Sequence, residues 1–131
     1  MAKTPHPGRI LILDDDIRVT KTLELIFIAR GYKVRVAYSA EEAVGIIAGW
    51  QPDVALVDVM LPIMNGIEFG CLLNENYPDT QVILVSGHPD SGQLLETAKK
   101  RGHSFALLAK PVHPGHILEI VAGLLPACCR V

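Results

Sequence analysis

The sequence predicts an α/β fold, in which a doubly wound sheet of five parallel strands carries helices on both faces. Five short apolar runs rich in Val, Ile and Leu recur along the chain, and continuous runs of this kind are typical of strands buried on both faces. Stretches of helical period separate them, which favours right-handed crossovers between parallel strands. The 131 residues have the length of one domain.

The predicted strands are the apolar runs themselves, and turn signals such as Arg30-Gly31 and Gln51-Pro52-Asp53 separate them from the helices. The strands cover Ile10–Leu13, Val34–Ala37, Val54–Val57, Val82–Val85 and Phe105–Ala109.

The predicted helices each follow one strand and begin at a capping residue. The first runs from Ile17 to Arg30, with Asp16 as its cap, and the last begins with Pro114 and ends near Leu125. The caps of the other helices are Ser39, Asn65 and Ser91. We therefore expect one domain over residues 9–126, between a flexible segment 1–8 and a tail 127–131.

Composition narrows the class of protein. Half of the residues are hydrophobic and the net charge is −2, which argues against a surface that binds nucleic acid directly. No apolar run is long enough to span a membrane, and the N-terminus lacks the apolar core of a signal peptide. Three cysteines, at positions 71, 128 and 129, do not make a disulfide framework. These features predict a cytoplasmic protein.

Residues with functional chemistry directly follow four of the five strands. Asp14-Asp15-Asp16 follow the first, Asp58 the third, Ser86 the fourth and Lys110-Pro111 the fifth. In open parallel sheets ligands bind beyond the carboxyl ends of the strands, so we expect these side chains to meet at one edge. A single Asp after a strand is usually a turn or cap residue, and Asp16 is predicted to be only that. The agreement of four strand ends is what favours a site.

Magnesium is the cation that this set of residues predicts. Carboxylates a few ångströms apart repel one another, and a hard divalent ion with oxygen ligands relieves the repulsion. A carboxylate nucleophile, a metal, a lysine and a hydroxyl around one cavity suit phosphoryl transfer.

The chain resembles the receiver domains of two-component response regulators, of the chemotaxis-regulator type, over about residues 9–125. The segment Asp58-Val-Met-Leu-Pro-Ile-Met-Asn-Gly66 is similar to the family's phosphorylation loop, and the acidic cluster, Ser86 and Lys110-Pro111 complete its pattern in order. The resemblance implies the flavodoxin-like three-layer α/β/α fold with strand order 2-1-3-4-5.

The resemblance also implies roles for individual residues. Asp58 is implied as the phosphoacceptor, and Asp14, Asp15, Asp58 and the Met60 backbone carbonyl as ligands of Mg²⁺. Ser86 and Lys110 are implied to contact the phosphoryl group. His88 stands two residues after Ser86, so its position near the mouth of the site, and not the resemblance, makes it a candidate to tune access of the hydrolytic water. The donor is implied to be a histidine kinase or a histidine phosphotransfer protein. The domain would then be a signalling phosphoacceptor rather than an enzyme, although it promotes its own phosphorylation and dephosphorylation. The target of its signal is implied to be a downstream protein or an output domain outside this chain. The oligomeric state stays open, with a dimer as one alternative.

One departure from the family pattern concerns the residue that passes the phosphorylation signal to the surface of the domain. Leu107 stands where receivers usually carry Tyr or Phe, three residues before the lysine, and Phe105 lies two residues earlier. We expect Leu107 to be turned inward in both states, so that it reports less of the switch than an aromatic ring does.

Three other interpretations remain open. A phosphatase of the haloacid-dehalogenase type would use Asp14-x-Asp16, but Arg18 stands where its motif needs Thr or Val. A flavodoxin-like module that binds a small ligand would need a phosphate-binding loop in place of three aspartates. A degenerate receiver that only binds partners is disfavoured by the intact Asp58, Asp15 and Lys110.

Overall fold

The computed structural model describes residues 8–61, 64–87, 96, 99–102, 105–110 and 112–125. The strands in this part of the chain are β1 (Arg9–Leu13), β2 (Lys33–Ala37), β3 (Val54–Asp58), β4 (Gln81–Ser86) and β5 (Ala106–Ala109). The helices are α1 (Ile17–Ala29), α2 (Ala40–Ile47), α3 (Gly66–Asn76) and α5 (Pro114–Leu124). Residues 1–7, most of the helix predicted from Ser91, and the tail 127–131 lie outside the described residues.

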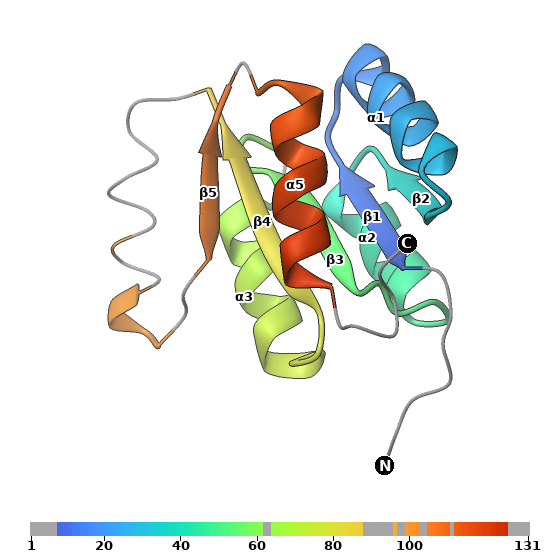
Figure 1. The fold of residues 1–131 in the computed structure, drawn as a ribbon. Helices are drawn as coiled ribbons and strands as arrows, with labels where there is room; N and C mark the ends of the chain where they lie inside the picture. Colours follow the sequence, from blue (N-terminus) through green and yellow to red (C-terminus); the bar gives the residue numbers. More distant parts are fainter. Residues whose placement is uncertain are drawn as a thin grey trace.

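The sheet is parallel and its strand order is β2-β1-β3-β4-β5, as predicted. Helices α1 and α5 cover one face, and α2 and α3 cover the other (Figure 1). Alternation along β1 divides the core between the two faces, because Ile10 and Ile12 pack under α1 and α5 whereas Leu11 and Leu13 face α2 and α3.

The prediction that the strands are buried on both faces is confirmed for the central strands and is wrong for the edge strands β2 and β5. All of β3 is buried, but three of the four residues of β5 are exposed. In β2 exposed and partly buried positions alternate over Lys33 to Val36, and only Ala37 is buried. An edge strand has a neighbour on one side only, so its side chains are covered less completely.

The helix starts follow the capping signals. Asp16 accepts hydrogen bonds from the backbone N–H groups of Arg18 and Val19, at 2.9 and 3.4 Å, and is the cap of α1 as predicted. Ser39 and Asn65 cap α2 and α3 in the same way. The Nδ1 atom of His113 accepts from Gly115 N–H at 3.0 Å, with Pro114 in the first turn of α5. No helix among the described residues is both long and apolar enough to cross a bilayer.

Candidate functional site

The register of the sheet brings the predicted residues together at the carboxyl ends of the strands. Leu13 of β1 pairs with Val57 of β3, so Asp14 and Asp58 follow side by side at the carboxyl ends of these strands. On the other side of β3, Ser86 of β4 pairs with Ala109 of β5, and the backbone N–H of Lys110 donates to the Ser86 carbonyl at 2.8 Å. Asp14, Asp58 and Ser86 are buried, whereas Asp15 is exposed.

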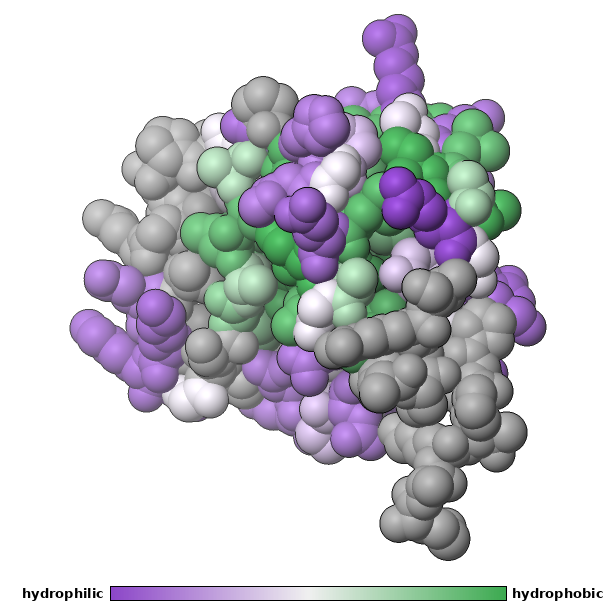
Figure 2. Space-filling view, viewed as in Figure 1, coloured by the Kyte–Doolittle hydropathy of each residue, from purple (hydrophilic) through white to green (hydrophobic). Residues whose placement is uncertain are grey.

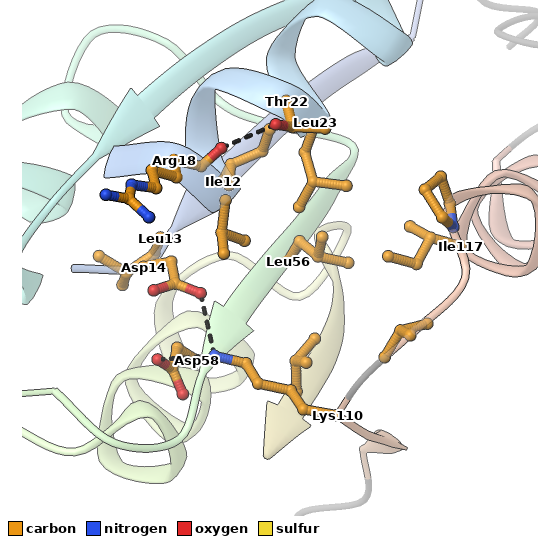
Figure 3. A pocket seen from close by; sticks show the side chains of 14 residues that line it. Ile12, Leu13, Asp14, Arg18, Thr22, Leu23, Leu56, Asp58, Lys110 and Ile117 are labelled. Atoms are coloured by element: carbon orange, nitrogen blue, oxygen red, sulfur yellow. Dashed lines mark hydrogen bonds and ion pairs between the residues drawn. The ribbon is translucent and has the colours of Figure 1, made fainter. Parts of the chain in front are cut away.

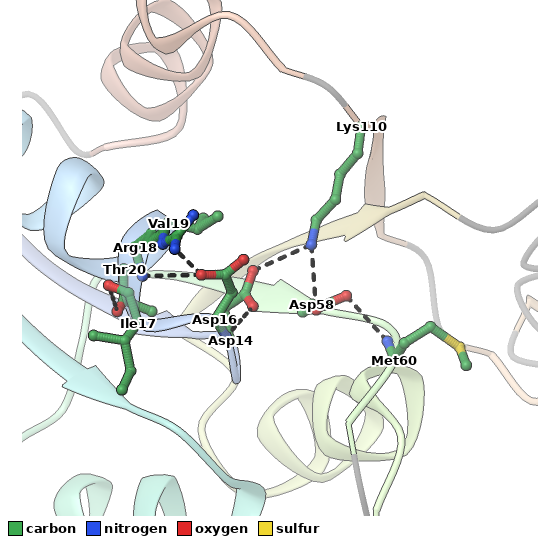
Figure 4. Close-up of polar contacts among 9 residues, drawn as sticks. All are labelled: Asp14, Asp16, Ile17, Arg18, Val19, Thr20, Asp58, Met60 and Lys110. Carbon is green, nitrogen blue, oxygen red and sulfur yellow. Dashed lines mark hydrogen bonds and ion pairs between the residues drawn. The ribbon is translucent and has the colours of Figure 1, made fainter.

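Lys110 links the two buried carboxylates. Its Nζ lies 3.3 Å from Asp14 Oδ2 and 3.3 Å from Asp58 Oδ2 (Figure 4). Each carboxylate also accepts one backbone N–H, that of Asp16 on Asp14 Oδ1 at 2.9 Å and that of Met60 on Asp58 Oδ1 at 3.1 Å. The side chain of Lys110, directly after β5, thus reaches Asp14, directly after β1, and Asp58 at the end of β3.

The charge state of the site is set by burial and by these contacts. Burial raises the pKa of Asp58, and the nearby Asp14 carboxylate raises it further, while the Met60 N–H and Lys110 act in the opposite direction and are outweighed. Burial alone would lower the pKa of Lys110, but the carboxylates of Asp14 and Asp58 outweigh it and raise that pKa. The metal-free site therefore holds more negative charge than its own lysine compensates.

The raised pKa of Asp58 predicts a pH dependence of stability. Above the unfolded value of about 4, the folded chain holds a proton that the unfolded chain has lost, so the free energy of unfolding falls as pH rises through the folded pKa. In Asp58→Asn this contribution is absent. We expect urea denaturation of the metal-free proteins, with a chelator present, to favour the variant increasingly as pH rises from 4 toward 8.

Lys110 does not disturb this comparison. Its pKa is raised in the folded chain, so its contribution to the free energy of unfolding is lost only in alkaline solution, above the pH range that is measured. A difference in unfolding free energy between the two proteins that stays constant from pH 4 to 8 would contradict the prediction.

The carboxylates form a set of donors suited to a cation. Asp14, Asp15 and Asp58 each place one carboxylate oxygen within 4.8 Å of the others. Oxygen ligands of this kind are the ones that Mg²⁺ and Ca²⁺ bind. The residues present thus fit a hard divalent ion, with two buried ligands and one ligand at the surface.

The sequence also predicted two modulators of the site, His88 and Leu107. His88 lies outside the described residues. The expectation that Leu107 is turned inward is wrong, because its side chain is 40% exposed. Phe105, the residue just before β5, is the partly buried one, and its ring packs against α3 so closely that a Cβ at Gly70 would lie 3.2 Å from it.

A cavity beside the carboxylates was not predicted from the sequence. It has a volume of about 620 Å³ and opens between the sheet, α1 and the start of α5 (Figure 3). Aliphatic side chains such as Ile12, Leu56 and Ile117 line its floor, and Asp14, Asp58 and Lys110 form its polar end. Arg18 of α1 also lines it. No local pattern signals such a cavity, because it depends on how α1 and α5 sit on the sheet.

The sequence also did not predict a structural role for Gly66, which lies next to Asp58. The backbone of Gly66, the first residue of α3, lies against that of Asp58, and a Cβ there would come within 2.1 Å of the Asp58 carbonyl oxygen. In the sequence this glycine closes the segment that resembles the family's phosphorylation loop and directly follows a capping residue, and neither sign shows the contact itself.

Comparison with known proteins identifies the family that the sequence resembles. The family model described as "Response regulator receiver domain" matches residues 10–122. A phosphoglycerate transport system transcriptional regulatory protein, PgtA of Salmonella typhimurium, is 30% identical over 117 residues, covering 88% of this chain and 28% of that protein. Response regulator MprA of Mycolicibacterium vanbaalenii is 34% identical over 80 residues, covering 61% of this chain and 35% of its own length. The chain thus spans about a third or less of these regulators.

Solved structures agree in fold. A response regulator receiver domain protein (CheY-like) from Methanospirillum hungatei superposes with a TM-score of 0.80 at 29% identity, covering 88% of this chain and 91% of that one.

Proposed function

Because this chain belongs to the response regulator receiver domain family of two-component signalling, we propose that it accepts a phosphoryl group on Asp58. The observation that carries the proposal is the contact of the Lys110 ammonium with both Asp14 and Asp58, at the edge where three carboxylate oxygens gather. A lysine held at this point leaves a cationic donor beside the oxygen that would receive phosphorus.

The proposed chemistry is an in-line transfer from phosphohistidine of a histidine kinase or phosphotransfer protein. An Asp58 carboxylate oxygen attacks phosphorus, the P–N bond to histidine breaks as the O–P bond forms, and the imidazole keeps the electron pair. Lys110 then pairs with one oxygen of the phosphoryl group, and the Ser86 hydroxyl donates to another. Hydrolysis of the acyl phosphate returns the domain to its starting state.

Mg²⁺ is the proposed cofactor, held by Asp14, Asp15, Asp58 and the Met60 backbone carbonyl. When bound, it would supply positive charge for the phosphoryl oxygens. The carboxylates themselves position the ion, and Asp14 and Asp58 are already fixed by Lys110 and by backbone N–H groups.

The signal is proposed to leave the domain through protein contacts. Since the matched segments make up only 28% and 35% of the lengths of PgtA and MprA, its target is either an output domain beyond residues 1–131 or a separate protein. We place this exchange in the cytoplasm, and we assign no direct nucleic-acid contact to the domain itself, in line with its net charge of −2.

Acetyl phosphate tests the proposal without a partner. Incubation with acetyl phosphate and Mg²⁺ should add one phosphoryl group to the intact protein by mass spectrometry, and a chelator should prevent it. Absence of any added phosphoryl group, from acetyl phosphate and from a phosphohistidine donor alike, would contradict the proposed function.

Mg²⁺ should also stabilise the folded chain, and Asp15→Ala should remove most of this effect. A ligand at a hundred times its Kd adds about 2.7 kcal/mol to the free energy of unfolding, which raises the melting temperature by several degrees. Asp15 is exposed, so its loss should change the metal-free melting temperature little. Melting curves over a Mg²⁺ titration measure both quantities.

The matched control for this titration is Asp79→Ala. Asp79 is an exposed carboxylate in the turn before β4, at the opposite edge of the sheet, and its removal should leave the Mg²⁺-dependent shift intact. If Asp15→Ala retains the full shift, the ion is held elsewhere.

A further inference from the structure

Helix α1 carries an apolar stripe on the side that faces away from the sheet. Ile17, Leu25 and Ile28 are 56%, 67% and 52% exposed, although α1 already buries Thr20, Leu23 and Phe27 on its inner side. At 3.6 residues per turn the three exposed side chains fall on one face, together with Lys21 and Glu24. In Figure 2 apolar atoms reach the surface at the upper right, where Figure 1 places α1.

The two charges within this stripe make no ion pair with another described residue. Lys21 is exposed and Glu24 is partly exposed. The outer face of α1 thus presents three large aliphatic side chains, with one cation and one anion between them.

The order of these residues is self-complementary. Ile17 and Ile28 lie at equal distances from the midpoint between Thr22 and Leu23, and so do Lys21 and Glu24. A two-fold axis through this midpoint pairs Ile17 with Ile28 and Lys21 with Glu24 on an antiparallel copy of the helix, whereas Leu25 falls opposite the buried position 20 and packs beside the axis without a like counterpart. Ile17 then meets Ile28 of the other copy, and Lys21 meets Glu24 twice.

We propose that this face of α1 binds a second copy of the chain, as an antiparallel pair of α1 helices. The charges at the helix ends favour this direction. Asp15 and Asp16 precede α1 and Arg30 follows it, so the antiparallel arrangement sets the acidic end of one helix beside the basic end of the other. A parallel pair would bring the two acidic ends together.

The proposed contact is small. Thirteen residues make a helix of about 20 Å, which provides less surface than the standard interface of about 800 Å² per partner. We therefore expect a weak, reversible dimer that forms at tens to hundreds of micromolar. The side of α1 that lines the cavity, at Arg18, Val19 and Thr22, stays outside the contact, so the dimer does not depend on the proposed phosphorylation of Asp58.

Charge reversal tests the pairing by sedimentation velocity over a concentration series. Lys21→Glu and Glu24→Lys should each weaken self-association of the full chain at least about fivefold, because each places two like-charged pairs across the axis. An equimolar mixture of these two variants should associate as tightly as the wild type, since both pairs of the mixed dimer are again opposite in sign. The double variant Lys21→Glu/Glu24→Lys should recover for the same reason.

Three results would overturn the proposal. In the first, the wild-type chain stays monomeric over the whole concentration series. In the second, the wild type associates but neither single charge reversal weakens the association. In the third, the equimolar mixture of Lys21→Glu and Glu24→Lys associates no better than either variant alone. Because all of these positions are at the surface, circular dichroism should show unchanged folding of each variant. Phosphoryl uptake is measured separately, so a failure of the proposed phosphorylation cannot be mistaken for a failure of the dimer.

Discussion

Replacement of Asp58 with Asn should abolish phosphoryl uptake from acetyl phosphate. The variant keeps the size of the side chain and an oxygen that can accept the Met60 N–H, but the amide is not a nucleophile. Loss of a nucleophile of this kind lowers a transfer rate by at least about 10³-fold. Intact-mass measurement against time should therefore show one phosphoryl group on the wild type and none on the variant.

The matched control lies in the acidic loop itself. Asp16 caps α1 through hydrogen bonds to two backbone N–H groups, and Asn caps helices as well as Asp does. Asp16→Asn should therefore fold normally and take up phosphate at nearly the wild-type rate. If Asp58→Asn takes up label at an unchanged rate, or if the label maps to another residue, Asp58 is not the phosphoacceptor.

The fold could be predicted because its signals are local. Each central strand is a continuous apolar run, and each described helix begins at a capping residue that makes the expected hydrogen bond, such as Ser39 or Asn65. The carboxyl ends of parallel strands lie at the same end of the sheet, so the sequence alone could place Asp14, Asp58 and Lys110 together, as the register confirms.

The parts that could not be predicted depend on packing between elements. Leu107 of β5 and Phe105, just before the strand, are two residues apart in extended chain, and no pattern in this segment shows which of them is covered. The outcome depends on Gly70 of α3, whose missing side chain leaves room for the Phe105 ring. The cavity between α1 and α5 and the exposed stripe of α1 likewise reflect distances between helices, which composition and periodicity do not contain.

Gly66 is the position where one added methyl group should have the largest effect on the fold around Asp58. Its backbone N–H donates to the Val59 carbonyl at 2.8 Å, and a Cβ there would lie 2.1 Å from the Asp58 carbonyl oxygen and 2.7 Å from its carbon. These neighbours are backbone atoms at the end of a fully buried strand, so they cannot turn away as a flexible side chain would. Among the described glycines, only Gly31 and Gly102 have a positive φ. Gly66 is therefore required for space rather than for an unusual conformation.

We expect Gly66→Ala to lower the free energy of unfolding by about 3 kcal/mol and to reduce phosphoryl uptake in the fraction that stays folded, because relief of the contact displaces Asp58 from Lys110. Urea denaturation and the acetyl phosphate assay measure the two effects. Gly45→Ala is the matched control: Gly45 lies within α2, nothing stands within 4 Å of its added Cβ, and the change should stabilise the chain by about 0.5–1 kcal/mol with uptake unchanged. Equal stability of the two variants would show that α3 can move away from Asp58 at little cost, and would remove Gly66 from the residues that position the site.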